Sequence, residues 1–185
     1  QGGQIWVESH PGNGSTFRFT PPLVSLENLV SSVFTSETAK ADQVGIITVE
    51  VFPEKARVLN NQDEKVLTEI WNILKFCILP DLDLVLPRIG RMDTGEVFFV
   101  LACSPPQGIC AMIRRIQSQL RQCARLQESD LSPAISPLTQ DLLNKDNSLS
   151  YDRQLEVVVN TLEELVEEKI DQRRDFNGKK ENTNS

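Results

Sequence analysis

The sequence predicts an α/β (α+β) fold, in which helices pack on one sheet in the order β-α-β-β-α-(β)-α and a β-hairpin precedes them. Three observations predict this fold. Residues 44–51 form an apolar run rich in Ile and Val, which is typical of a central strand. Residues 62–78 and 107–123 repeat apolar side chains at helical spacing. Residues 4–9 and 15–20 alternate in the manner of strands on either side of a turn.

The hairpin is expected to end at Pro21 and Pro22, because proline lacks the N–H group that a strand ladder needs. Its turn is a run of turn-forming residues, His10-Pro11-Gly12-Asn13-Gly14. A two-stranded hairpin is marginally stable alone. We therefore expect its packing partners upstream of residue 1 or in the domain that follows.

Residues 24–43 are expected to form a linker that contains a short amphipathic helix. The apolar positions of this helix are Leu26, Leu29, Val30, Val33 and Phe34.

The rest of the chain predicts two strands joined by a turn at residues 92–95, one strand weakened by prolines, and one helix. These elements are residues 83–89, 96–102, 129–138 and 152–170. The polar tail over residues 171–185 is expected to be disordered.

Composition restricts the function. The chain has 185 residues and a net charge of −7, which disfavours nucleic acid as a partner. No apolar run is long enough to span a bilayer, so we expect no direct membrane contact, although the parent protein could be anchored upstream. None of the four cysteines forms a C-x-x-C pair, which disfavours a zinc site and favours buried thiols in the reducing cytoplasm.

The first residues resemble the end of a sensor histidine kinase ATP-binding domain. The resemblance covers residues 2–23 and rests on the strand Gly2-Gly3-Gln4-Ile5-Trp6-Val7-Glu8-Ser9, the turn Pro11-Gly12-Asn13-Gly14 and the strand Ser15-Thr16-Phe17-Arg18-Phe19. Pro21 stands where the family usually has Leu. The chain therefore predicts a fragment of that domain at residues 1–23.

The resemblance implies ATP and magnesium in the parent kinase, and no cofactor or catalytic residue in this fragment. The elements that hold ATP in the family lie upstream of the matched segment. Ser15 matches a residue that approaches the adenine pocket, so it is the one cofactor-proximal residue that can be carried over. His10 lies in the turn and is interpreted as a solvated turn residue, not as the phosphoaccepting His.

Residues 44–170 resemble a degenerate GGDEF domain of diguanylate cyclases, whose fold is a ferredoxin-like palm. Three stretches carry the resemblance: Ile46 to Phe52 with Glu54-Lys55, the helix from Val66 to Ile78, and Thr94 to Leu101. The family holds magnesium with carboxylates, and Glu50 and Glu96 occupy the two metal positions as vestigial ligands.

Three departures predict that the domain is not an active cyclase. Val97 stands where the signature has Glu, and Thr94 replaces a Gly. The loop from Leu59 to Gln62, which would read guanine, is short, and no R-x-x-D inhibitory motif occurs in the sequence. Exposed structural roles for Glu50 and Glu96 remain an alternative to metal binding.

The leading hypothesis is a non-catalytic regulatory or output module at the C-terminus of a sensor histidine kinase, in two-component phosphorelay signalling. Its expected partners are the kinase core in cis, a response regulator or a second copy. The alternative is a pseudo-cyclase that binds GTP without turnover. Two helices carry charge of opposite sign. The arginines of one are interpreted as a solvated face, a partner-binding face or a phosphate-binding face, and the acidic last helix is a candidate to pair with it within or between chains. These positions are Arg114, Arg115, Arg121 and Arg125, and Glu156, Glu163, Glu164, Glu167 and Glu168.

Overall fold

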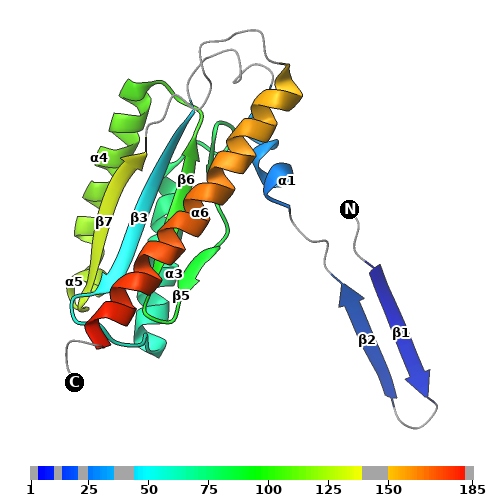
Figure 1. Cartoon of the computed structure of the whole chain (residues 1–185). Helices are drawn as coiled ribbons and strands as arrows, with labels where there is room; N and C mark the ends of the chain where they lie inside the picture. The colour runs from blue at the N-terminus through cyan, green and yellow to red at the C-terminus, as the bar shows by residue number, and fades with distance from the viewer. Residues whose placement is uncertain (1–3, 11–13, 21–24, 36–43, 139–149, 182–185) are drawn as a thin grey trace.

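The computed structural model describes residues 4–10, 14–20, 25–35, 44–138 and 150–181. Within these ranges the chain forms a two-stranded hairpin and a mixed α/β body with a five-stranded antiparallel sheet (Figure 1). The predicted α/β class is confirmed, and the second region follows the expected order except that β4 and β5 replace one strand and the short α5 is added after α4. No described helix has the length and apolar content needed to cross a bilayer.

The hairpin pairs β1 (Gln4–His10) with β2 (Gly14–Thr20) in antiparallel register from Gln4 opposite Thr20 to His10 opposite Gly14. Gly14 has a φ of 84°, a conformation that glycine adopts without steric cost, and this accounts for a glycine where the second strand begins. The remaining turn residues, 11–13, lie outside the described residues.

The sheet of the α/β body runs β4-β6-β3-β7, and β5 also pairs with β6. Its strands are β3 (Gly45–Pro53), β4 (Asp83–Val85), β5 (Gly90–Met92), β6 (Gly95–Ala102) and β7 (Leu131–Leu138). The long apolar strands β3 and β6 lie in the middle and are buried along nearly their whole length. The proline-containing β7 lies at an edge, where a missing N–H does least harm.

The segment predicted as one strand over residues 83–89 is two short strands, β4 and β5. Residues 86–89 separate them and contain Pro87, which can donate no ladder hydrogen bond. The expected turn is present, because Asp93 and Thr94 connect β5 to β6 with Met92 opposite Gly95.

Three helices cover one face of the sheet. They are α3 (Asn61–Cys77), α4 (Pro106–Gln122) and the short α5 (Ala124–Gln127). A capping box starts α3: the Asn60 side chain accepts from the backbone N–H of Asp63, whose carboxylate accepts from the N–H of Asn60 at 2.7 Å. The apolar stripes of α3 and α4 pack against every second residue of β3 and β6 to form the larger core.

The opposite face is covered by α1 (Leu26–Val30) and α6 (Tyr151–Glu181), which crosses the front of the sheet in Figure 1. The Tyr151 ring stacks on Phe34 with centroids 5.9 Å apart, and its hydroxyl donates to the Phe34 carbonyl at 2.7 Å. The molecule therefore has three layers, with the sheet between two layers of helices (Figure 1).

Two predicted boundaries need correction. The expected linker contributes Val30, Val33 and Phe34 to the core under α6, because their spacing places three apolar side chains on one side. The tail expected to be disordered continues α6 as far as Glu181. Its polar residues include good helix formers that extend an existing helix, and Gln172 donates to Glu168 one turn earlier.

Candidate functional site

The two predicted metal ligands lie on neighbouring strands but on opposite faces of the sheet. Glu50 of β3 stands opposite Val97 of β6, and Glu96 stands opposite Val51. Directly opposed residues share a face, whereas successive residues of a strand alternate. Glu50 therefore faces α6, and Glu96 faces α3. Because the sheet separates them, the structure does not bring the two carboxylates together around one metal ion.

Glu96 is fully buried and held by two arginines. The Arg88 Nε donates to one carboxylate oxygen at 2.7 Å, and its Nη2 donates to the other. Arg91 Nη1 lies 4.0 Å from Glu96. Both arginines also reach Glu64 in the first turn of α3. The hydrogen bonds to Glu96 raise the pKa of Arg88. The charge that a metal ion would have to neutralise is thus already neutralised by guanidinium groups.

Glu50 is held from the other face of the sheet. The Lys169 Nζ of α6 donates to Glu50 Oε1 at 2.8 Å, and the two side chains keep 18% and 10% of their exposed area. This ion pair joins residues 119 positions apart in sequence. Sequence reasoning singled out Glu50 but missed Lys169, because nothing local to either residue indicates the pairing.

A third charged cluster centres on Arg57, which follows β3. Its guanidinium donates to Asp63 at 2.5 and 3.0 Å and to Asp130 at 3.0 Å through Nε. The hydrogen bond from Arg57 lowers the pKa of Asp63, and it does the same for Asp130. The cluster ties the loop after β3 to the start of α3 and to the residue before β7. Sequence reasoning missed it, although the capping box at Asn60 was a readable local signal.

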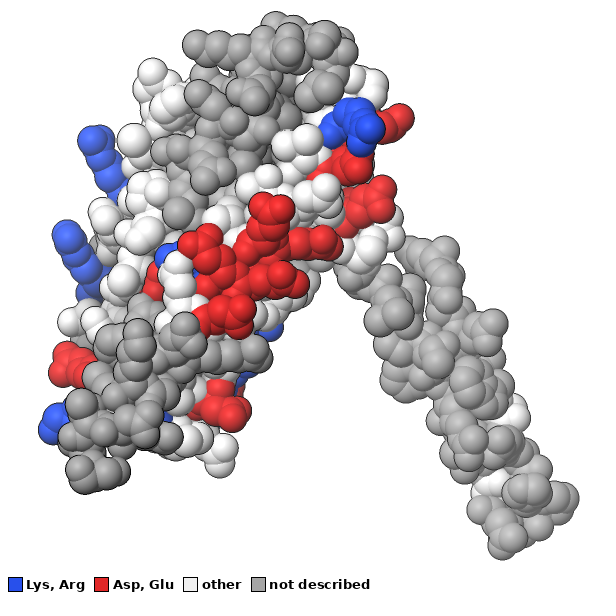
Figure 2. Space-filling model, viewed as in Figure 1, with Lys and Arg blue, Asp and Glu red and all other residues white. Residues whose placement is uncertain are grey.

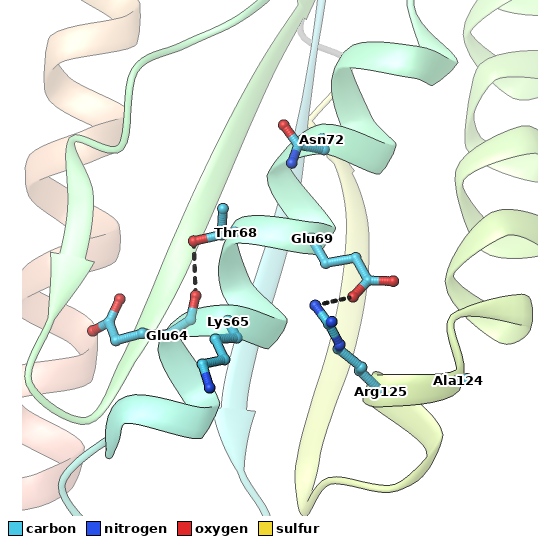
Figure 3. A pocket seen from close by; sticks show the side chains of 7 residues that line it. All are labelled: Glu64, Lys65, Thr68, Glu69, Asn72, Ala124 and Arg125. Atoms are coloured by element: carbon cyan, nitrogen blue, oxygen red, sulfur yellow. Dashed lines mark hydrogen bonds and ion pairs between the residues drawn. The ribbon is translucent and has the colours of Figure 1, made fainter.

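A groove of about 580 Å³ lies between α3 and α5. Figure 3 shows its lining, which comprises Glu64, Lys65, Thr68, Glu69, Asn72, Ala124 and Arg125. The Thr68 hydroxyl donates to the Glu64 carbonyl at 2.8 Å, and Arg125 lies 3.2 Å from Glu69. The groove is open, and its charges are of both signs. Within the described part of the chain, no group of three or more His, Cys, Asp or Glu side chains is placed to hold a metal ion.

The other predicted positions are scattered. Ser15 lies in β2 opposite Ser9 in the hairpin, and His10 ends β1. Val97 is completely buried on the α6 face of β6. Thr94 lies in the turn before Gly95. A Cβ on Gly95 would come within 2.2 Å of the Phe52 ring, which accounts for glycine at that position.

The short loop expected to lack guanine readers is used to start a helix. The Asn60 side-chain oxygen accepts from Gln62 N at 2.7 Å, and Leu59 N donates to the Asp93 carbonyl at 2.8 Å. These groups are thus engaged with backbone groups of the start of α3 and of the turn before β6.

No protein-family model matches this chain, and no curated protein or solved structure is similar to it at a significant level. The resemblances to a histidine kinase and to a GGDEF domain therefore rest on the residues quoted above.

Proposed function

We propose that this chain is the regulatory or output module at the C-terminus of a sensor histidine kinase, and that it acts through protein contacts and not through catalysis. The observation that carries the non-catalytic part is the state of Glu50 and Glu96. They face opposite sides of the sheet, and each is neutralised by a basic side chain.

The chemistry of phosphoryl transfer explains why this observation matters. Metal ions that activate GTP need carboxylate oxygens that converge on one point. A magnesium ion at Glu96 would have to displace Arg88 from a buried, two-point hydrogen-bonded pair. A magnesium ion at Glu50 would have to displace Lys169. The two ions would lie on opposite faces of the sheet, so Glu50 and Glu96 cannot form one two-metal site.

Topology supports a degenerate palm domain. From β3 to β7 the elements run β-α-β-β-α-β once the short β5 and α5 are left out, and β6 and β3 lie centrally with β4 and β7 outside them. This order supports the split β-α-β arrangement of ferredoxin-like folds that we propose for the domain. Because proteins of many unrelated functions share this arrangement, it supports the palm fold but does not indicate a particular activity.

Support for the kinase part comes from residues 2–23. Their glycines, turn and two strands follow the order of the family motif, and β1 and β2 pair in continuous register as that motif requires. Under this proposal ATP and magnesium are bound by the upstream kinase domain, and Ser15 only lies near the adenine pocket.

The proposal is tested by titrating the whole chain with GTP and magnesium in a calorimeter and assaying for cyclic dinucleotides. We expect neither binding heat nor product. Micromolar GTP binding would instead establish the pseudo-cyclase sensor. The kinase part is tested separately by reading the gene upstream of residue 1. An Asn-bearing helix and a D-x-G-x-G loop are expected there, and their absence would overturn it.

A further inference from the structure

We propose that the arginine face of α4 is a docking surface for the acidic face of α6 in a second copy of this chain. The arginine face is defined by Arg114 and Arg121. The acidic face is defined by Glu156, Glu163, Glu164, Glu167 and Glu168. This inference rests on the proposed interaction function and names its partner.

The charged side chains of α4 itself are all basic, although Glu54, which follows β3, lines the same groove as Arg121. No acidic residue occurs between Glu96 and Glu128, so every charge of α4 and α5 is a basic one. Arg114 and Arg121 are both exposed and seven residues apart, which places them on one stripe about 10.5 Å apart along the helix. Neither has an ion-pair partner among the described residues.

The two nearby arginines are less available. The Arg115 guanidinium donates to the Cys77 carbonyl at 2.6 and 3.0 Å, which caps the C-terminal end of α3. Arg125, which was expected on the same helix, lies on α5 and pairs with Glu69. The positive charge that α4 offers to a partner is therefore concentrated at Arg114 and Arg121.

The acidic face presents matching spacing. All five of its glutamates are exposed, and Glu156 and Glu163 are also seven residues apart, with Glu156 in an exposed ion pair with Arg153 at 2.6 Å that a partner arginine would have to displace. Figure 2 shows the acidic side chains gathered over α6, with basic side chains projecting at the left edge beside α4. Two helices with the same seven-residue spacing of opposite charge can align two ion pairs at once.

The pairing has to occur between copies. The layer of α6 and the layer of α4 lie on opposite faces of the sheet, so the sheet separates the two faces within one molecule (Figure 1). The contact is therefore head-to-tail, and each added copy leaves one face of each kind exposed. Such contacts extend into chains or close into rings and do not stop at a two-fold dimer.

Exposed ion pairs are individually weak and are screened by salt. The net charge of −7 also opposes association at long range. We therefore expect assembly only at high protein concentration and low ionic strength, with a steep decrease on adding salt.

The test uses sedimentation velocity on the full chain and on two neutralised variants. The first is Arg114→Gln with Arg121→Gln, and the second is Glu156→Gln with Glu163→Gln, so that each removes one of the two matching charged pairs. Wild type is expected to increase in mean mass with concentration at 20 mM salt and to return to monomer at 500 mM. Each variant alone is expected to lose at least tenfold in association constant. A mixture of the two is expected to form a species of twice the monomer mass, because only one productive contact remains.

The matched control is Lys55→Gln with Lys65→Gln, two exposed lysines that are not on α4. It removes the same charge and is expected to associate like wild type. A wild type that stays monomeric at millimolar concentration, association that persists in high salt, or equal loss in the lysine control would each overturn the inference. None of these outcomes alters the GTP titration, so a failure here is distinguishable from a failure of the proposed function.

Discussion

Glu50 and Val97 stand directly opposite each other on β3 and β6, on the sheet face that α6 covers. Under the proposed resemblance to a GGDEF domain, Val97 stands where the signature has Glu. Val97→Glu would therefore place a second carboxylate against Glu50 in a buried layer. We expect it to lower the free energy of unfolding by about 3–5 kcal/mol, because a buried charge without a counter-ion is costly and like charges across a ladder repel.

Urea unfolding followed by circular dichroism measures this loss. The matched control is Val58→Glu, since Val58 is 68% exposed and the same change there should cost less than about 0.5 kcal/mol. We also expect no cyclic dinucleotide from Val97→Glu. A Val97→Glu protein as stable as wild type would show that this position is not buried as described.

The ion pair between Glu50 and Lys169 fastens α6 to the sheet. Lys169→Met should cost on the order of 3 kcal/mol, because it leaves the largely buried Glu50 without that ammonium group. Adding Glu50→Gln should recover part of the loss, which gives a coupling energy of about 1–3 kcal/mol in a double-mutant cycle. Lys65→Met, at an exposed position of α3, is the control and should be near neutral. Strict additivity of the two substitutions would contradict the pairing.

Substitution of Phe34 tests whether the segment expected to be a linker belongs to the α/β core. Phe34 is completely buried, whereas Phe76 near the end of α3 is 79% exposed. Phe34→Ala should cost about 3–5 kcal/mol, and Phe76→Ala should stay within about 0.5 kcal/mol. Tyr151→Phe, which removes the hydroxyl bonded to the Phe34 carbonyl, should cost about 0.5–1.5 kcal/mol. Equal effects of the two alanine substitutions in urea unfolding would place Phe34, and with it the segment that follows α1, outside the core.

Most of the fold could be predicted from sequence because its elements carry local signals. The apolar run of β3 and the helical spacing in α3 and α4 depend only on nearby residues, and their bounds agree with the structure within about two residues. The packing of Phe34 on Tyr151 could not be predicted, since short apolar stretches do not say what covers them. The end of α6 was missed because polarity alone does not distinguish a solvated helix from a disordered tail.

The candidate site was harder to predict for a geometric reason. Sequence identified Glu50 and Glu96 as acidic residues near strand ends. Whether they converge depends on the register between β3 and β6, and a shift of one residue changes the face of the sheet. The pairs Lys169–Glu50 and Arg57–Asp130 were also out of reach, because they join residues 119 and 73 positions apart and have no local sequence signal.

The cysteines differ in reactivity according to burial. Burial raises the pKa of Cys103 to about 12, and it also raises the pKa of Cys77 and Cys123, whereas Cys110 is exposed. Because the thiolate is the reactive form, we expect a disulfide reagent at pH 8 to modify one thiol rapidly in the native protein and all four in guanidinium chloride. Cys110→Ser should abolish the rapid phase, and Cys123→Ser should leave it unchanged. Rapid modification of two or more native thiols would contradict the described burial.

The stability that the Arg57 cluster contributes is expected to depend on pH. Hydrogen bonding to Arg57 lowers the pKa of Asp63 from its ordinary value of 3.8. A group whose pKa is lower in the folded state stabilises the fold above its unfolded pKa and loses that contribution as the pH falls through the folded pKa. Arg57→Met should therefore reduce the melting temperature by a few degrees at pH 7, and the difference from wild type should diminish below pH 3.8.

Arg153→Met, which breaks an exposed pair with Glu156, is the control and should show almost no difference at either pH. A deficit in Arg57→Met that stays constant from pH 7 to pH 2.5 would mean that packing of the arginine side chain, and not its pairing with Asp63, supports this corner of the fold.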